Sequence, residues 1–210
     1  MMKKKFLIKI NILAFLIIFI CSSGTLGSLT YSKLADELMD INEIGLKYIG
    51  VYNCSCEDII NDFKSNSVVE KIEKGKNYIT LIGKMNNINY EAGIRDDKTK
   101  EVVVELNKIT DKKEIGIIKK QLEKLTNDKC KEKRYFTYIK GKINKDTDKE
   151  TEKLTDVFKQ HGADNIRTIP INSGYAGIAD IGSFRINYAV CRYDSGTYMV
   201  LGTPDIFITY

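Results

Sequence analysis

The sequence predicts an α+β protein made of two similar halves, each with the element order helix, strand, helix and three strands. One observation behind this prediction is that amphipathic helical segments and strand-like segments follow one another in the same order twice. The other is a short repeat, in which Ile88–Asn89–Tyr90 and Asp96 return at a constant offset as Ile186–Asn187–Tyr188 and Asp194. Runs of strands flanked by helices favour antiparallel sheets that pack one face on helices.

The first half is predicted over residues 28–109. Apolar residues at helical spacing predict a helix over Tyr31–Ile44, ended by Gly45, and the aromatic and β-branched residues of Leu46–Cys54 predict a strand. Ser55 is a typical N-cap for the next helix, with an acidic residue three positions later. Three further strands, separated by Asn-rich and Asp-rich turns, are predicted over Asn77–Met85, Ile88–Ile94 and Glu101–Leu106.

The second half is predicted over residues 110–210. Thr110 is expected to cap one amphipathic helix, and Thr147 or Asp148 to cap another, which ends at His161–Gly162. The strands predicted here are Tyr135–Ile143, Asn165–Ile171, Phe184–Arg192, Thr197–Leu201 and a short last strand, Ile206–Tyr210.

Composition and charge narrow the classes of function. The chain has 210 residues, 43% hydrophobic and 29% charged, with only 2 Pro, which is typical of a globular protein rather than a disordered one. The net charge is +5, but four lysines precede residue 28, so the remainder is nearly neutral. Such a balance does not suit a general nucleic-acid binder, which needs many basic contacts on one face. The basic run Lys129–Arg134 is interpreted as the solvated end of a helix, with contact to phosphate or to an anionic wall polymer as the alternative.

Residues 1–27 predict a signal peptide. Lysines open the segment, Ile12–Cys21 is an unbroken apolar run, and mostly small and polar residues follow it. Cleavage is expected after Gly24 or Gly27. The alternative is an uncleaved N-terminal anchor, since about 20 residues suffice to cross a membrane. Lipidation of Cys21 is disfavoured by the bulky residues before it. In every case the rest of the chain is expected outside the cytoplasm, secreted or anchored to the outer face of the cell membrane.

Four cysteines follow this segment: Cys54, Cys56, Cys130 and Cys191. An even number in an exported chain is compatible with disulfides in any of three pairings, and free buried thiols are the alternative. A zinc site lacks donors, because His161 is the only histidine and there is no second close cysteine pair. No metal and no cofactor are therefore expected.

The sequence nominates no catalytic residue. His161 falls in the last turn of a predicted helix, where interaction with the helix dipole explains it better than activation of a nucleophile. The acidic residues fall in first turns of helices and in hairpin turns, so no carboxylate pair for glycoside hydrolysis emerges. The segment Gly174–Gly182 has three glycines but opens no helix, so it lacks the context of a dinucleotide fingerprint.

One binding surface is nominated: Tyr175 together with Arg192, Tyr193 and Asp194. Tyrosine and arginine often anchor interfaces, and with 12 Tyr and no Trp the amphipathic aromatic surface of this chain rests on tyrosine. The alternative is that these tyrosines are half-buried and pack across the strands of a sheet.

A family resemblance lies in the last third of the chain. It is carried by Asn172–Tyr175, Ile186–Asp194, Gly196–Tyr198, Leu201–Ile206 and Tyr210. These segments resemble the YwmB family, exported proteins of spore-forming Gram-positive bacteria. The resemblance implies a fold like that of the TATA-box-binding protein, with two similar α+β halves and curved antiparallel sheets, and it implies no established activity. Cys191 departs from the aliphatic residue expected at its position.

Together these observations favour a non-catalytic binding or assembly module at the cell envelope, with a link to sporulation implied by the resemblance alone. The expected partner is an envelope protein or a wall polymer, not nucleic acid, and membrane contact is expected only through an uncleaved N-terminal segment. The alternative is an envelope (cell-wall) hydrolase whose carboxylates the sequence does not identify.

Overall fold

The computed structural model describes residues 31, 33–109, 111–125, 129–143, 147–203 and 206. The predicted signal peptide over residues 1–27 and the Thr110 cap lie outside these residues. Of the predicted last strand only Ile206 is described, and it is not in a strand. No helix within the described part of the chain is long and apolar enough to cross a membrane.

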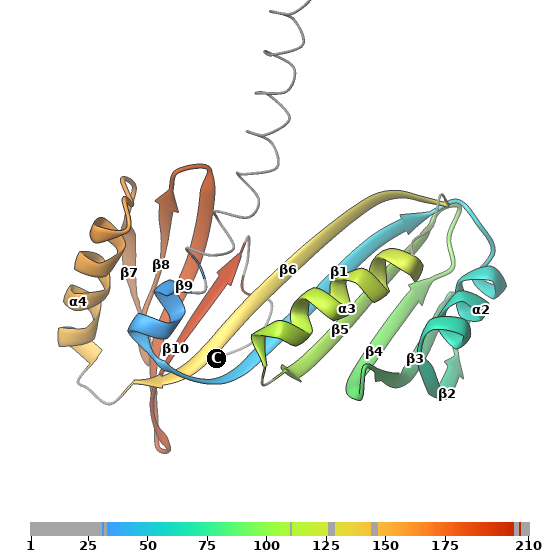
Figure 1. Ribbon diagram of the computed structural model, residues 1–210, viewed down its shortest axis with the longest axis horizontal. Coiled ribbons are helices and arrows are strands. Elements are labelled where there is room, and N and C mark those ends of the chain that lie inside the picture. The colour runs from blue at the N-terminus through green and yellow to red at the C-terminus, as the bar shows by residue number, and fades with distance from the viewer. Residues whose placement is uncertain are drawn as a thin grey trace, which may run out of the picture.

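The described residues form ten strands and three long helices (Figure 1). The helices are α2 (Cys56–Asn66), α3 (Lys112–Leu125) and α4 (Thr147–Gln160), and residues 33–38 are also helical. The strands are β1 (Asp40–Tyr52), β2 (Val68–Lys74), β3 (Tyr78–Met85), β4 (Ile88–Arg95), β5 (Lys100–Ile109), β6 (Cys130–Ile143), β7 (Arg167–Ile171), β8 (Gly174–Ile181), β9 (Phe184–Tyr193) and β10 (Gly196–Thr203).

The strands make one open antiparallel sheet in the order β2-β3-β4-β5-β1-β6-β10-β9-β8-β7. The predicted α+β class with antiparallel strands is therefore confirmed. The two longest strands, β1 and β6, pair at the centre, from Asp40 opposite Lys142 to Tyr52 opposite Cys130. Strands from residues 40–109 lie on one side of this pairing and strands from residues 130–203 on the other (Figure 1).

All three long helices cover the same face of the sheet (Figure 1). The strand residues that face them alternate with residues that do not, as period-two strand geometry requires. Leu46 and Tyr48 of β1 and Val104 of β5, for example, are fully buried in the main hydrophobic cluster. Residues 33–38 pack into the same cluster, and the hydroxyl of Tyr31 donates to the backbone oxygen of Leu201 at 2.8 Å.

The repeated Ile-Asn-Tyr segments occupy matching places in the sheet. Tyr90 lies on β4 and Tyr188 on β9, each on the third strand from an edge, and each opposite a glycine of the neighbouring strand, Gly83 or Gly177. Each tyrosine also packs against a phenylalanine from the covering helix. The ring centroids are 5.7 Å apart for Phe63 of α2 with Tyr90, and 5.1 Å apart for Phe158 of α4 with Tyr188.

Several local predictions are confirmed. The Ser55 side chain accepts a hydrogen bond from the backbone of Asp58, whose carboxylate accepts one in return, so a capping box starts α2. Gly162 follows α4 in a left-handed conformation, with φ +80°. Asn86 and Asn87 both have positive φ in the turn between β3 and β4, which suits a tight hairpin.

The helix predicted over Tyr31–Ile44 is wrong beyond residue 38, because β1 begins at Asp40. Ile41 and Ile44 fit a helical stripe, but from Leu46 onward the burial alternates, and β1 has partners on both sides, β5 and β6. Gly45 therefore does not end a helix. It lies within β1, where the ring of Tyr138 occupies the space that a side chain would need.

The prediction of three strands after the second helix of each half is also wrong, because there are four. β2 was missed because its charged residues are typical of an exposed edge strand, and β8 was missed because its glycines weaken the strand signal. The basic run Lys129–Arg134 is not a helix end, because β6 starts at Cys130 and continues through it.

Gly83 and Gly177, which lie opposite the core tyrosines Tyr90 and Tyr188, are expected to be needed for the stability of the fold. A methyl group at Gly83 would overlap the backbone oxygen of Val68, and one at Gly177 would overlap that of Arg167. Gly83→Ala and Gly177→Ala should each lower the free energy of unfolding by about 1–3 kcal/mol, measured by urea denaturation. Gly116→Ala is the matched control. Nothing lies near its side-chain position in α3, so it should stabilise the chain by about 0.5–1 kcal/mol. Equal effects at all three positions would contradict this account.

Candidate binding face

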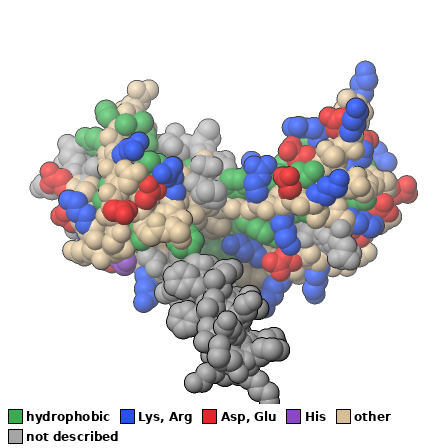
Figure 2. Space-filling model, turned by 90° about the horizontal axis from the view of Figure 1, so that it is seen from above, with side chains coloured by type: hydrophobic (Ala, Val, Ile, Leu, Met, Phe, Trp, Pro, Cys, Tyr) green, Lys and Arg blue, Asp and Glu red, His purple; other side chains and the backbone are tan. Residues whose placement is uncertain are grey.

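The face of the sheet opposite the three long helices is hollowed between two raised ends (Figure 2). We call it the helix-free face. Strand alternation places there the residues that do not point at the helices. On the central and second-half strands these are Lys47 and Ile49 of β1, Arg134, Phe136, Tyr138, Lys140 and Lys142 of β6, Tyr198 and Val200 of β10, and Ala189, Cys191 and Tyr193 of β9.

Charges on the helix-free face are mixed, and three of its cations pair with carboxylates across neighbouring strands. Lys47 lies 2.8 Å from Glu105, and Arg95 lies 3.3 Å from Glu101. At the far end of the sheet, Arg185 bonds Asp180 at 2.8 Å. Cross-strand pairs of this kind contribute modestly to stability, and they place acidic side chains among the basic ones on this face. The helix-free face is therefore not a continuous basic surface.

Tyrosine and lysine side chains cluster where β6, β10 and β9 adjoin. The ammonium group of Lys140 lies 5.6 Å from the ring centroid of Tyr198, a cation–π distance, and the rings of Tyr193 and Tyr198 are 5.9 Å apart in a T-shaped arrangement. Rings with a polar end and a nearby cation suit recognition of a partner that is partly apolar and partly polar.

Tyr138 is the buried centre of this region. Its backbone lies opposite Gly45 on one side and Gly202 on the other, so its ring has room between two glycines. Its hydroxyl donates to the carboxylate of Glu43 and lies 3.3 Å from Oδ1 of Asn107. Burial and the negative charge of Glu43 both raise the pKa of Tyr138, so it stays protonated at neutral pH and acts as a hydrogen-bond donor.

The structure distributes the nominated residues Tyr175, Arg192, Tyr193 and Asp194 over both faces. Tyr175 lies opposite Val190, and Arg192 shares the face of Val190, so both are on the helix side at one end of the second half. Tyr193 points to the helix-free face beside Tyr198, and Asp194 lies in the exposed turn between β9 and β10. The four residues therefore do not form one surface.

The sequence analysis missed Lys140, Tyr198 and Phe136 as surface candidates. The available signal was the alternation of β6, in which every second residue from Arg134 to Lys142 is cationic or aromatic. That signal was obscured because the neighbouring lysines suggested a helix end.

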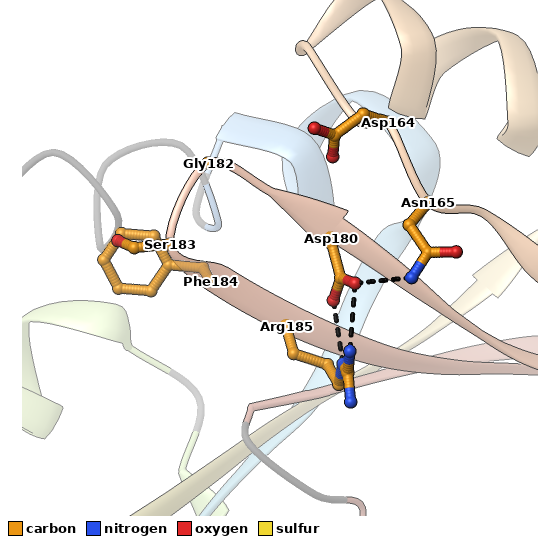
Figure 3. Close-up of a pocket in the computed structure, with 7 residues that line it drawn as sticks. All are labelled: Asp164, Asn165, Asp180, Gly182, Ser183, Phe184 and Arg185. Atoms are coloured by element: carbon orange, nitrogen blue, oxygen red, sulfur yellow. Dashed lines mark hydrogen bonds and ion pairs between the residues drawn. The ribbon is translucent and has the colours of Figure 1, made fainter.

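A shallow pocket of about 620 Å³ lies at the hairpin between β8 and β9 (Figure 3). Asp180 is at its centre. Its carboxylate accepts bonds from Nε and Nη2 of Arg185 at 2.8 and 3.0 Å, and from the side-chain amide of Asn165 at 2.8 Å. Asp164 lines the same pocket. The arrangement is a polar network that holds the start of β7 against the β8–β9 hairpin.

Two carboxylates, those of Asp164 and Asp180, line this pocket, so we consider it as a candidate site for the acidic pair of a hydrolase. The hydrogen bonds from Arg185 and Asn165 lower the pKa of Asp180 to about 2. A carboxylate held ionised in this way is unsuited to act as a general acid, which needs a raised pKa. Asp180 therefore does not qualify as the general acid of such a pair.

The four described cysteines are free thiols. Cys54 follows β1, Cys56 begins α2 and Cys130 begins β6, whereas Cys191 is buried in β9 in the other half of the sheet. Burial raises the pKa of Cys54 and of Cys56, which makes both poor nucleophiles at neutral pH. Among the described residues no group of three or more His, Cys, Asp or Glu is arranged to hold a metal ion.

His161 follows the last residue of α4. Its backbone N–H donates to the oxygen of Val157 at 3.0 Å, and its ring Nε2 lies 3.1 Å from a carboxylate oxygen of Glu37. The side chain therefore links α4 to the helical residues 33–38 and has no nucleophile among its hydrogen-bond partners.

No family model matches the sequence, and no curated protein matches it. The function must therefore be argued from the faces and side chains described above.

The hydrogen bonds to Asp180 are expected to make the stability of the fold depend on pH in the acidic range. A pKa of about 2 in the folded chain, against about 3.9 for an unperturbed aspartate, means that the ion pair stabilises the fold above pH 4 and that this stabilisation is lost as the pH falls toward 2. Carboxyl NMR titration should give this low value for the wild type, and Arg185→Gln should return it toward the ordinary range. An unchanged pKa in the variant would show that Arg185 is not the cause.

Proposed function

We propose that this chain is an exported binding or assembly module of the cell envelope that holds its partner on the helix-free face. The observation that carries the proposal is the face itself. A sheet of ten described strands has all the long helices of the described residues on one side, and the other side is hollowed in profile. Tyr193, Tyr198 and Lys140 cluster on that other side. Concave surfaces with aromatic anchors and a few placed charges are suited to binding.

The chemistry available at the described residues supports binding rather than catalysis. Burial raises the pKa values of Tyr48 and Tyr138, and that of the partly buried Cys54, so these groups stay protonated, and Asp180 is held ionised by Arg185. No described group combines a nucleophile, a base and a positioned acid. We therefore propose a binding module in preference to an envelope hydrolase as the function of this chain.

We also propose that the fold is a duplication like that of the TATA-box-binding protein, with halves at residues 28–109 and 110–210. The matching environments of Tyr90 and Tyr188 support it. Each tyrosine packs against a phenylalanine of a covering helix and lies opposite a glycine of the neighbouring strand. The strand order also supports it, because it reads outward from the β1–β6 pairing in a similar way on both sides. Membership of the YwmB family, and with it a link to sporulation, rests on the sequence resemblance.

The partner we propose is an envelope protein or a wall polymer. Nucleic acid is disfavoured, although the proposed fold type includes a DNA-binding protein, because function belongs to sites rather than folds. Phosphate-backbone binding needs many unpaired cations on one face, and here Lys47, Arg95 and Arg185 each pair with a carboxylate.

A capture experiment tests which face binds. The full chain, immobilised, is exposed to purified wall polymer and to detergent-solubilised membrane proteins of the producing cells. Tyr193→Ala with Tyr198→Ala should weaken capture more than about tenfold, the effect expected for interface anchors. The matched variant, Tyr175→Ala with Arg192→Ala, changes the same kinds of side chain on the helix side and should leave capture unchanged. Loss of capture by the second variant alone would place the partner on the other face.

A further inference from the structure

Three of the four described cysteines lie at one end of the central β1–β6 pairing. Cys54 follows β1 by two residues, Cys56 begins α2, and Cys130 is the first residue of β6. All three are partly buried and pack against the main hydrophobic cluster, whereas Cys191 is 1% exposed within β9, in the other half of the sheet. This end of the ladder therefore carries thiols from segments that are far apart in the chain.

The strand register makes Cys54 a neighbour of Cys130. Tyr52 lies opposite Cys130, and the pairing continues one residue further, where the backbone N–H of Asn53 donates to the oxygen of Lys129 at 3.1 Å. Cys54, two residues after Tyr52, is therefore the diagonal neighbour of Cys130. Diagonal neighbours have Cα atoms about 7–8 Å apart and a disulfide takes about 4.4–6.8 Å, so a bridge needs a shift of about 1–2 Å. Residues 53–54 form a bend after the end of β1, where such a shift disrupts no ladder.

Both thiols also lie near the same pair of buried hydroxyl groups. Sγ of Cys130 lies 3.4 Å from the hydroxyl of Tyr48, which lies 3.1 Å from the hydroxyl of Tyr52. Burial raises the pKa of Tyr52, and negative charge on Cys130 or on Cys54 raises it further, as expected when both sulfur atoms lie near this hydroxyl. Tyr48 and Tyr52 belong to the main cluster, so the two thiols approach each other on the helix side of the sheet.

The other two cysteines are placed less well for a bridge. Burial and a hydrogen bond to Asp96 raise the pKa of the Cys56 thiol, and this bond directs Cys56 toward the turn between β4 and β5. A bridge from Cys54 to Cys56 would span a single residue and close a small, strained ring. Cys191 lies in the other half of the sheet. Among the possible pairings, the structure therefore favours Cys54 with Cys130.

We propose that Cys54 and Cys130 form a disulfide that joins the two halves of the sheet covalently. The free thiols described above are the reduced form of this pair. On oxidation two S–H bonds break and one S–S bond forms, and the two protons and two electrons pass to the disulfide of an envelope thiol–disulfide oxidoreductase, which becomes a dithiol. Burial raises the pKa of Cys54, so little thiolate forms at neutral pH and the exchange is slow without such a catalyst.

The oxidation step rests on the proposed export of the chain, because disulfides persist mainly outside the cytoplasm. The choice of partners rests on the register alone. A bridge between positions 54 and 130 closes a long loop and so removes conformational freedom from the unfolded chain. It therefore stabilises the β1–β6 ladder, through which the two halves share one sheet.

Peptide mapping tests the pairing. The folded, reduced full chain, with Cys21 changed to Ser, is treated with oxidised glutathione at mildly alkaline pH. The remaining thiols are then alkylated, and the digest is analysed by mass spectrometry. A linked pair of peptides that contain Cys54 and Cys130 is expected, with Cys56 and Cys191 alkylated. The matched variant Cys56→Ser should form the same link at the same rate, whereas Cys130→Ser should form no internal link.

A link between Cys54 and Cys56, or the absence of any internal link, overturns the proposal. Chain recovered from producing cells in the presence of an alkylating agent should carry the same Cys54–Cys130 link, and its absence there overturns the oxidation step. Neither experiment uses a partner, so the disulfide can fail while capture succeeds, and the reverse.

Urea denaturation tests the effect of the bridge. The linked chain should have a folding equilibrium constant at least about thirtyfold larger than that of the reduced chain. The double variant Cys54→Ser with Cys130→Ser should unfold at the same urea concentration with and without reductant. Equal midpoints for the linked and the reduced chain would overturn the claim that the bridge holds the halves together.

Discussion

The antiparallel pairing of β1 with β6 is the constraint on which the rest of this structure depends. These are the longest strands, and they are paired from Asp40 opposite Lys142 to Tyr52 opposite Cys130. Through this one ladder, the strands of residues 40–109 and those of residues 130–203 become a single sheet instead of two. A small separate sheet with one helix would bury little apolar area, whereas the joined sheet supports one extended hydrophobic cluster.

The same pairing determines where a partner can bind. With the long helices on one face, each strand must keep one set of alternate residues out of the main cluster, and these residues form the helix-free face. Near its centre, Tyr138 fills the space over Gly45, and Lys140 lies against Tyr198. Elsewhere on this face some charged residues pair across strands, as Lys47 does with Glu105, so the face carries charges of both signs.

Local sequence signals predicted much of this fold, and non-local pairing explains what they missed. The Ser55 capping box, the Asn86–Asn87 turn and the Gly162 helix end depend only on neighbouring residues, and all three are as predicted. The start of β1 was missed because Ile41 and Ile44 fit a helix until β5 and β6 are available as partners. The edge strand β2 and the glycine-rich β8 carry weak strand signals, and it is pairing with β3 and β9 that defines them.

The candidate site was harder to predict than the fold. Tyr193 lies on the helix-free face, but which face a strand residue occupies follows from register, and a single sequence does not give register. Tyr175 and Arg192 seemed to belong with Tyr193 because they lie close in the predicted hairpins, yet alternation puts them on the helix side. Lys140 and Tyr198 meet only because β6 pairs with β10, a contact between segments far apart in the chain.

The most direct test of the central claim, that the helix-free face holds an envelope partner, is site-specific photocrosslinking in intact producing cells. A photoreactive residue replaces Tyr193 on the helix-free face in one strain, and Ile117, an exposed position on α3, in another. The account predicts a specific crosslinked species, protein or wall polymer, from position 193 and none from position 117. Crosslinking from position 117 alone would contradict it and place binding on the helix side.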